Sequence, residues 1–165
     1  MKKYLLAAAL AVTAVPAMAQ DEEGLVEFSM LKPEVAMTLA TTAMEYCRDN
    51  GYQVGVSVVD RFGNEQVFIR DRYAGTHVRE TAHRKAWTAV SFRTDTLALG
   101  ELTQPGSLMF GIRDLSMALP LGGGVPVEAA GSIVAGIGVS GAPGPDIDDD
   151  CAREGIEAII DLIGF

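Results

Sequence analysis

The segment Ile133–Ser140 constrains the fold of this chain more than any other. Its residues alternate between two faces, Ile133, Ala135, Ile137 and Val139 on one and Val134, Gly136, Gly138 and Ser140 on the other. A period of two is typical of a β-strand. The first face predicts burial in a core, and the second is small enough for a helix, a second subunit or a flat ligand to approach the backbone closely.

The remaining elements follow from periodicity and turn residues. We expect helices from Pro33 to about Asn50, over Thr76–Phe92, over Thr96–Leu102 and from Asp146 towards the end, with strands over Val54–Val58, Glu65–Arg70, Ser116–Leu121, Val125–Ala129 and Ile133–Ser140. Gly122–Gly124 is read as a hairpin turn. This order predicts an α+β fold, a five-stranded antiparallel sheet flanked by helices.

The N-terminus has the pattern of a secretory signal peptide. Lys2 and Lys3 precede the apolar run from Tyr4 to Val15, and Ala17-Met18-Ala19 has the small-residue pattern of a cleavage site. The run is shorter than the roughly 20 residues that span a bilayer. We therefore expect residues 1–19 to be removed, residues 20–30 to form a flexible segment and residues 31–165 to form one domain of a periplasmic or secreted protein, with no membrane span in the mature chain.

The charge of the chain argues against nucleic acid as a partner. Its 13 Lys and Arg stand against 22 Asp and Glu, and loss of Lys2 and Lys3 with the signal would leave 11 against 22, a formal charge of −11. Binding to phosphate backbones requires clustered basic residues, and an acidic surface repels polyanions.

The two cysteines, Cys47 and Cys151, lie on different predicted helices, far apart in the sequence. An exported protein can form a disulfide between them if the two helices are neighbours. Two buried thiols that behave as small apolar side chains are the alternative. Their spacing excludes a Cys-x-x-Cys redox or zinc motif.

Few residues have the pattern of a catalytic or metal site. His77 and His83 are six apart on a predicted helix and would point to nearly opposite sides, so they are not expected to bind one metal ion unless the helix begins after His77. His83 and Trp87 share a face, which suits a flat aromatic ligand or ordinary core packing.

Ser140 lacks the Gly-x-Ser-x-Gly turn of a hydrolase nucleophile. Among the acidic residues near the C-terminus, Glu154 and Glu157 share a helical face and could bind a hard cation or ferric iron weakly, although a solvated helix start explains this acidic cluster equally well. The sequence therefore does not establish an enzyme.

Five sequence blocks resemble the GlcG/HbpS family, which includes the C-terminal domain of PduO-type proteins. They are Val58-Val59-Asp60 with Gly63, Lys85-Ala86-Trp87-Thr88-Ala89, Gln104-Pro105-Gly106, Gly122-Gly123-Gly124-Val125-Pro126 and Gly136-Ile137-Gly138-Val139-Ser140-Gly141. The resemblance runs from about Leu31 to the end. It implies a profilin-like sandwich, a homo-oligomer, and binding of haem or a related tetrapyrrole, with haem degradation proposed for such domains.

The resemblance supplies no single haem ligand common to all members. His77, His83 and Tyr73 are candidates because imidazole and phenolate are plausible iron ligands, and Trp87 is a candidate through the face that it shares with His83.

Two functions are the main candidates, and an enzyme that acts through Ser140 or the carboxylates is a third. The first is an exported haem-binding protein that sequesters, senses or helps to degrade haem. The alternative is a non-catalytic module that binds a small ligand such as an organic acid, or that assembles with an exported enzyme through the small face of Ile133–Ser140.

Overall fold

The computed structural model describes residues 24–164, so the predicted signal peptide and its cleavage site lie outside the described residues. The described elements are α1 (Pro33–Asp49), β1 (Gly55–Asp60), β2 (Glu65–Arg70), α2 (Val78–Phe92), α3 (Thr96–Leu102), the 3-10 helix η1 (Phe110–Asp114), β3 (Gly124–Ala129), β4 (Ser132–Ser140), α4 (Pro145–Glu157) and α5 (Ile160–Ile163). Residues 24–30 contain no helix or strand, and their side chains are exposed. No helix in this part of the chain is long and apolar enough to cross a bilayer.

The sheet has four strands in the order β2-β1-β4-β3, and every neighbouring pair is antiparallel. The α+β prediction and the antiparallel arrangement are confirmed. The prediction of a fifth strand is wrong, because Ser116–Leu121 forms no strand. Gly124, expected in a turn, begins β3 and pairs with Gly138.

The backbone of the predicted fifth strand is bonded to side chains of α2 instead. Leu119 N donates to Thr88 Oγ1 at 2.9 Å, and Arg84 donates to the carbonyl oxygen of Ala118 at 2.9 Å. Pro120 has no N–H to contribute to a ladder. The segment therefore runs along α2 and leaves the sheet with β3 at its edge.

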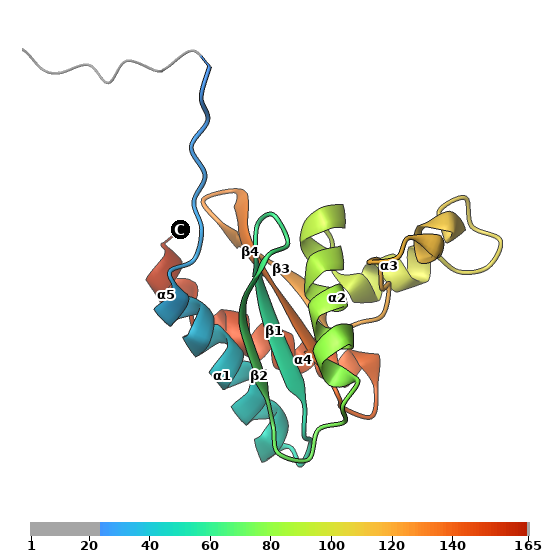
Figure 1. Ribbon diagram of the computed structural model, residues 1–165, viewed down its shortest axis with the longest axis horizontal. Helices are drawn as coiled ribbons and strands as arrows, with labels where there is room; N and C mark the ends of the chain where they lie inside the picture. Colours follow the sequence, from blue (N-terminus) through green and yellow to red (C-terminus); the bar gives the residue numbers. More distant parts are fainter. Residues whose placement is uncertain (1–23, 165) are drawn as a thin grey trace, which may run out of the picture.

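Helices cover both faces of the sheet (Figure 1). The larger core lies between the sheet and α1 with α4, and it contains Leu39, Val56, Val58, Ile137 and Ala152 among its fully buried side chains. A smaller cluster of Val59, Ala86 and Val90 lies beneath α2 on the other face.

The small face of β4 is covered by α2. A Cβ atom at Gly138 would lie 2.0 Å from the carbonyl oxygen of Ala82, and one at Gly136 would lie 2.6 Å from Cγ1 of Val90. Of the three occupants that the sequence leaves open for this face, the chain's own helix is the one present. The expectation that the glycine face leaves room for a flat ligand or a second copy is therefore wrong.

A disulfide joins α1 to α4. Cys47 and Cys151 are bonded, with their Cα atoms 5.6 Å apart and a sequence separation of 104. Both cysteines are fully buried in the larger core. Of the two alternatives for these cysteines, the structure contains the disulfide.

Candidate ligand-binding site

Two open clefts lie beside α2. The first, which we call the His83 cleft, is lined by Glu65, Thr76, Arg79, Glu80 and His83 and has a volume of about 440 Å³. It opens between the hairpin strand β2 and the first turns of α2. One wall therefore comes from the sheet and the other from the helix.

His83 has one buried nitrogen that lacks a partner. Its Nδ1 atom makes no hydrogen bond within the described residues, and it lies 3.8 Å from Glu65 Oε1. The side chain as a whole is 29% exposed. Because Nδ1 is buried, Nε2 is the ring nitrogen left for a ligand in the cleft.

The carboxylate opposite His83 is held in place by two neighbours. Ser57 Oγ donates to Glu65 Oε1 at 3.1 Å, and Arg79 donates to Glu65 Oε2 at 2.8 Å. A histidine that binds a metal commonly directs its second ring nitrogen at a carboxylate, which fixes the orientation of the ring. Glu65 lies beside Nδ1, and a small movement that shortens the 3.8 Å separation to hydrogen-bond distance would let it act in this way on His83.

The second cleft also has a volume of about 440 Å³, and we call it the Lys85 cleft. It is lined by His77, Thr81, Lys85, Leu121, Ser140, Asp148 and the loop from Gly141 to Pro145. Lys85 Nζ donates to Asp148 Oδ2 at 2.7 Å and to the carbonyl oxygen of Val139 at 2.9 Å. Asp148 Oδ1 in turn accepts from the backbone N–H of Ala142 at 3.0 Å.

Burial dominates the electrostatics of the Lys85–Asp148 pair. The side chains are 1% and 5% exposed. Loss of hydration lowers the pKa of Lys85 and raises the pKa of Asp148, while the attraction between the two charges opposes both changes. A larger fraction of Lys85 is therefore a neutral amine than for a lysine in water at the same pH.

Hydroxyl groups and an imidazole surround this ion pair. Thr81 Oγ1 and Ser140 Oγ are 2.7 Å apart, and Ser140 is 6% exposed. His77 is exposed and lines the same cleft. The cleft therefore combines a buried amine with several groups that can bind a polar ligand.

The structure separates the residues predicted for ligand binding. α2 begins at Val78, immediately after His77, and His77 and His83 nevertheless line different clefts. Trp87 lies against the hairpin turn, where a Cβ at Gly63 would be 2.6 Å from its Cδ1 atom, and it lines neither cleft. Tyr73 is 81% exposed and also lines neither cleft.

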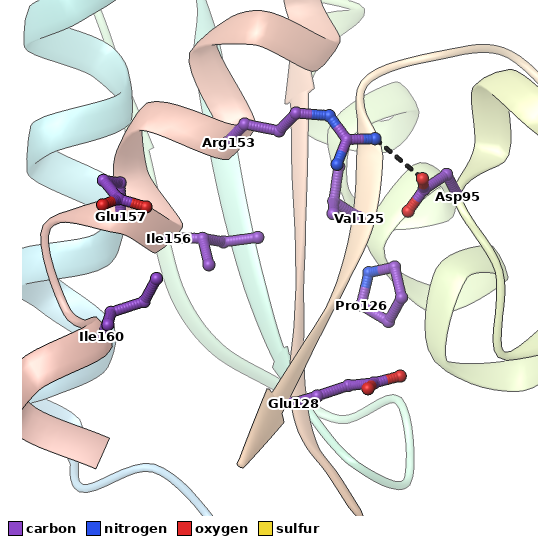
Figure 2. A pocket seen from close by; sticks show the side chains of 8 residues that line it. All are labelled: Asp95, Val125, Pro126, Glu128, Arg153, Ile156, Glu157 and Ile160. Carbon is purple, nitrogen blue, oxygen red and sulfur yellow. Dashed lines mark hydrogen bonds and ion pairs between the residues drawn. The ribbon is translucent and has the colours of Figure 1, made fainter. Parts of the chain in front are cut away.

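The acidic residues of α4 belong to a different surface. Glu154 and Glu157 are exposed, and no group of three metal-ligating side chains is present among residues 24–164. Glu157 lines a third open cleft of about 470 Å³ (Figure 2). Arg153 in this cleft is bonded to Asp95 at 2.7 Å and to Asp149 at 2.8 Å. Weak metal binding by Glu154 and Glu157 stays a prediction.

The sequence interpretation missed Lys85 and Asp148. The acidic run at the start of α4 was expected to be solvated, but Asp148 and Asp149 are each only 4% exposed. Lys85 lies three residues after Ala82 and four before Ala89, next to Ala86, on the helix face that is predicted to be buried. A lysine on such a face requires a buried acceptor, so the sequence indicates a buried partner for Lys85 without identifying it.

Comparisons with known proteins agree with this architecture. The structure of a double mutant of HbpS from Streptomyces reticuli has a TM-score of 0.79 and is 38% identical, covering 90% of this chain and 99% of that one. The structure of a PduOC haem complex has a TM-score of 0.75 and is 32% identical, covering 79% of this chain and 95% of that one. These two structures support the fold over nearly the whole domain.

A relative known from its sequence is much longer. PduO of Salmonella typhimurium, a corrinoid adenosyltransferase, is 34% identical over 123 residues, which are 73% of this chain and 36% of PduO. The chain thus spans only about a third of that relative. The family described as haem degrading protein HbpS-like matches residues 31–157. With its antiparallel sheet, its helix packed on glycine and this match over most of its length, the chain belongs to the HbpS-like family.

Proposed function

We propose that this protein binds haem. The observation that carries the proposal is its similarity to a domain whose structure contains haem, at 32% identity over 95% of that structure. The family's description as haem degrading supports the same ligand.

Within the chain, the His83 cleft fits a haem group best. An imidazole can bind haem iron, and His83 combines a buried Nδ1 atom near a carboxylate with a ring that lines an open cleft. Arg79 is 65% exposed on the same cleft, and a guanidinium can pair with a haem propionate. His83 would hold the iron, Glu65 would orient the imidazole and Arg79 would bind a carboxylate of the ligand.

A hemin titration of the mature protein tests both parts of this proposal. We expect a saturable shift of the Soret band that His83→Gln weakens at least tenfold, because the iron loses its protein ligand. His77→Gln is the matched control, since it removes a histidine from the other cleft. A featureless titration contradicts haem binding, and a loss caused only by His77→Gln moves the ligand to the Lys85 cleft.

Sequestration, sensing and assistance to haem degradation are separate roles of such a protein. If the chain takes part in degradation, the bound haem should lose its Soret band under a mild reductant and oxygen faster than free haem does. A stable spectrum under those conditions supports sequestration or sensing.

We also infer that the protein is exported. The order of charged, apolar and small residues at the N-terminus supports this, and the Cys47–Cys151 disulfide is typical of an oxidising compartment. Protein recovered from the periplasm or the medium should have the mass of a chain that begins at Gln20. A full-length mass in the cytosolic fraction contradicts export.

Self-association is a further part of the proposal, expected from the family resemblance. The segment between α3 and β3 projects from the body of the molecule (Figure 1) and exposes Leu108, Met109, Phe110 and Leu115. A second copy packed on these side chains would remove them from water. Light scattering of wild type against a Leu108→Asp, Phe110→Asp variant should show a lower mass for the variant.

The alternative function is a module that binds a different small molecule. Native mass spectrometry of protein taken directly from cells distinguishes it from haem binding. A retained haem, a retained organic acid and an empty chain have different masses. The polar groups of the Lys85 cleft are the observation that favours a small polar ligand.

A further inference from the structure

The chain has only four lysines, Lys2, Lys3, Lys32 and Lys85, and one of them is buried beside a cleft. Lys32 is exposed at the start of α1. Lys85 is 1% exposed and lines the Lys85 cleft together with Asp148. A solvated lysine would be strongly hydrated, whereas Lys85 has exchanged its hydration for protein contacts.

The contacts of Lys85 leave part of its bonding capacity free. An ammonium group has three N–H donors, and two acceptors, Asp148 Oδ2 and the Val139 carbonyl oxygen, lie within hydrogen-bond distance among the described residues. A purely structural ion pair would not need the additional polar groups Ser140, Thr81 and His77 in the same cleft. These groups can hold the oxygen atom of a small ligand close to Nζ.

We propose that Lys85 forms a Schiff base with a small aldehyde that enters the Lys85 cleft. This activity goes beyond haem binding and does not depend on it. The ligand class follows from the amine, because a buried lysine next to a proton acceptor is suited to attack a carbonyl carbon.

The reaction is balanced within the residues present. The Lys85 ammonium gives a proton to the Asp148 carboxylate, and the neutral Nζ forms a bond to the carbonyl carbon. The carbonyl oxygen takes a proton from the attacking nitrogen to give a neutral carbinolamine. The C–O bond then breaks with the proton held by Asp148, which leaves a protonated imine beside the Asp148 carboxylate. One water molecule leaves, the imine remains on Lys85, and no oxidant or reductant is consumed.

The surroundings of Lys85 favour this step. Burial lowers the pKa of Lys85, which increases the fraction of nucleophilic amine. Gly123 packs closely on the ion pair, since a Cβ there would be 3.0 Å from Lys85 Nζ and 2.7 Å from Asp148 Cβ. A small aldehyde in the cleft would meet Lys85 together with the hydroxyl groups of Thr81 and Ser140, which line the same cleft.

Reductive trapping tests the proposal on the mature protein. The protein is incubated at pH 7 with acetaldehyde and cyanoborohydride, and the positions of the added ethyl group are mapped by peptide mass spectrometry. We expect Lys85 to be labelled at least tenfold faster than Lys32, which serves as the exposed amine within the same chain. Labelling of Lys32 or the N-terminal amine with none at Lys85 overturns the proposal.

Two further measurements separate reaction in the cleft from mere exposure by unfolding. Ser140→Ala should slow the labelling of Lys85 at least threefold, because a hydroxyl that contacts the ligand is lost. The unfolding transition should stay close to that of wild type, because the variant removes only one side-chain hydrogen bond, that to Thr81. Labelling of Lys85 that Ser140→Ala does not slow would contradict a ligand site in the Lys85 cleft.

Lys32→Arg is the control that must leave the labelling of Lys85 unchanged. The hemin titration is independent of this result, because His83 lies in the other cleft. Loss of aldehyde labelling with intact haem binding refutes this inference alone, and the reverse outcome refutes the haem proposal alone.

Discussion

Lys85 and Asp148 place two opposite charges in the interior of this protein. The two charges are almost completely removed from water and are held 2.7 Å apart. A buried pair of this kind contributes little net stability compared with apolar residues, but removal of one partner leaves the other charge without compensation.

We therefore expect Lys85→Met to lower the free energy of unfolding by about 3 to 5 kcal/mol. The double variant Lys85→Met, Asp148→Leu should recover a large part of that loss, because no charge is left in the interior. Urea denaturation measures both. A single variant that unfolds like wild type would show that water hydrates Asp148 in solution.

A second ion pair gives the protein a dependence on pH. Arg48 Nε donates to Asp71 Oδ2 at 2.7 Å, and Asp71 is 4% exposed. The hydrogen bond from Arg48 lowers the pKa of Asp71. The folded form thus prefers the ionised carboxylate more than the unfolded chain does.

This pair should stabilise the fold fully above the unfolded pKa of an aspartate, about 3.9, and less as the pH falls through the lower folded pKa. Between pH 5 and pH 2.5 we expect the Tm of wild type to fall several degrees further than that of Asp71→Asn. Asp49→Asn, which removes an exposed carboxylate from α1, is the control and should follow wild type. Parallel curves for wild type and Asp71→Asn would contradict the assignment.

At the scale of elements, the packing of α2 on β4 positions both clefts. Because Gly136 and Gly138 have no side chains, the helix backbone lies directly on the strand. His83 and Lys85 then project to different sides of this contact and line separate clefts. A side chain on β4 would push the helix away and change both clefts together.

Gly138→Ala is expected to cost more than 4 kcal/mol or to prevent folding, since its Cβ would be 2.0 Å from the Ala82 carbonyl oxygen. Gly111→Ala is the matched control, because nothing lies within 4 Å of a Cβ at that position. Its effect should stay within about 0.5 kcal/mol. Thermal unfolding followed by circular dichroism compares the two, and equal Tm values would contradict the close packing.

The elements that could be predicted are those whose periodicity is local. The strand Ile133–Ser140 and the helix Thr76–Phe92 agree with the structure within two residues at either end. Ser116–Leu121 could not be placed, because its backbone bonds go to Thr88 and Arg84, about thirty residues earlier. The Lys85–Asp148 pair was missed for a similar reason, since its partners are 63 residues apart in sequence.

At the scale of the whole molecule, long-range links hold the layers together. The disulfide joins α1 and α4 on one face of the sheet, and the Lys85–Asp148 pair joins α4 to α2 on the other face. α4 is thus connected to a helix on each side of the sheet.

Loss of the disulfide should lower the free energy of unfolding by about 2 to 5 kcal/mol, because the bond constrains a long segment of the unfolded chain. The variant Cys47→Ala, Cys151→Ala measures this in urea. A reductant should destabilise wild type and leave the double variant unchanged. Equal sensitivity of both proteins to reductant would contradict the disulfide.

The position of α4 also has a consequence for attack by proteases. A protease needs an extended, unfolded stretch of backbone. The strands β1 and β4 lie between helices that are joined by the Cys47–Cys151 disulfide and the Lys85–Asp148 ion pair. If α2 separates from the sheet, the disulfide still joins α4 to α1, and if α1 separates, the ion pair still joins α4 to α2. Cleavage of the interior strands therefore requires the disulfide and the Lys85–Asp148 ion pair to break in the same molecule. We expect the first cuts in segments 24–30 and 104–116, which are mostly exposed.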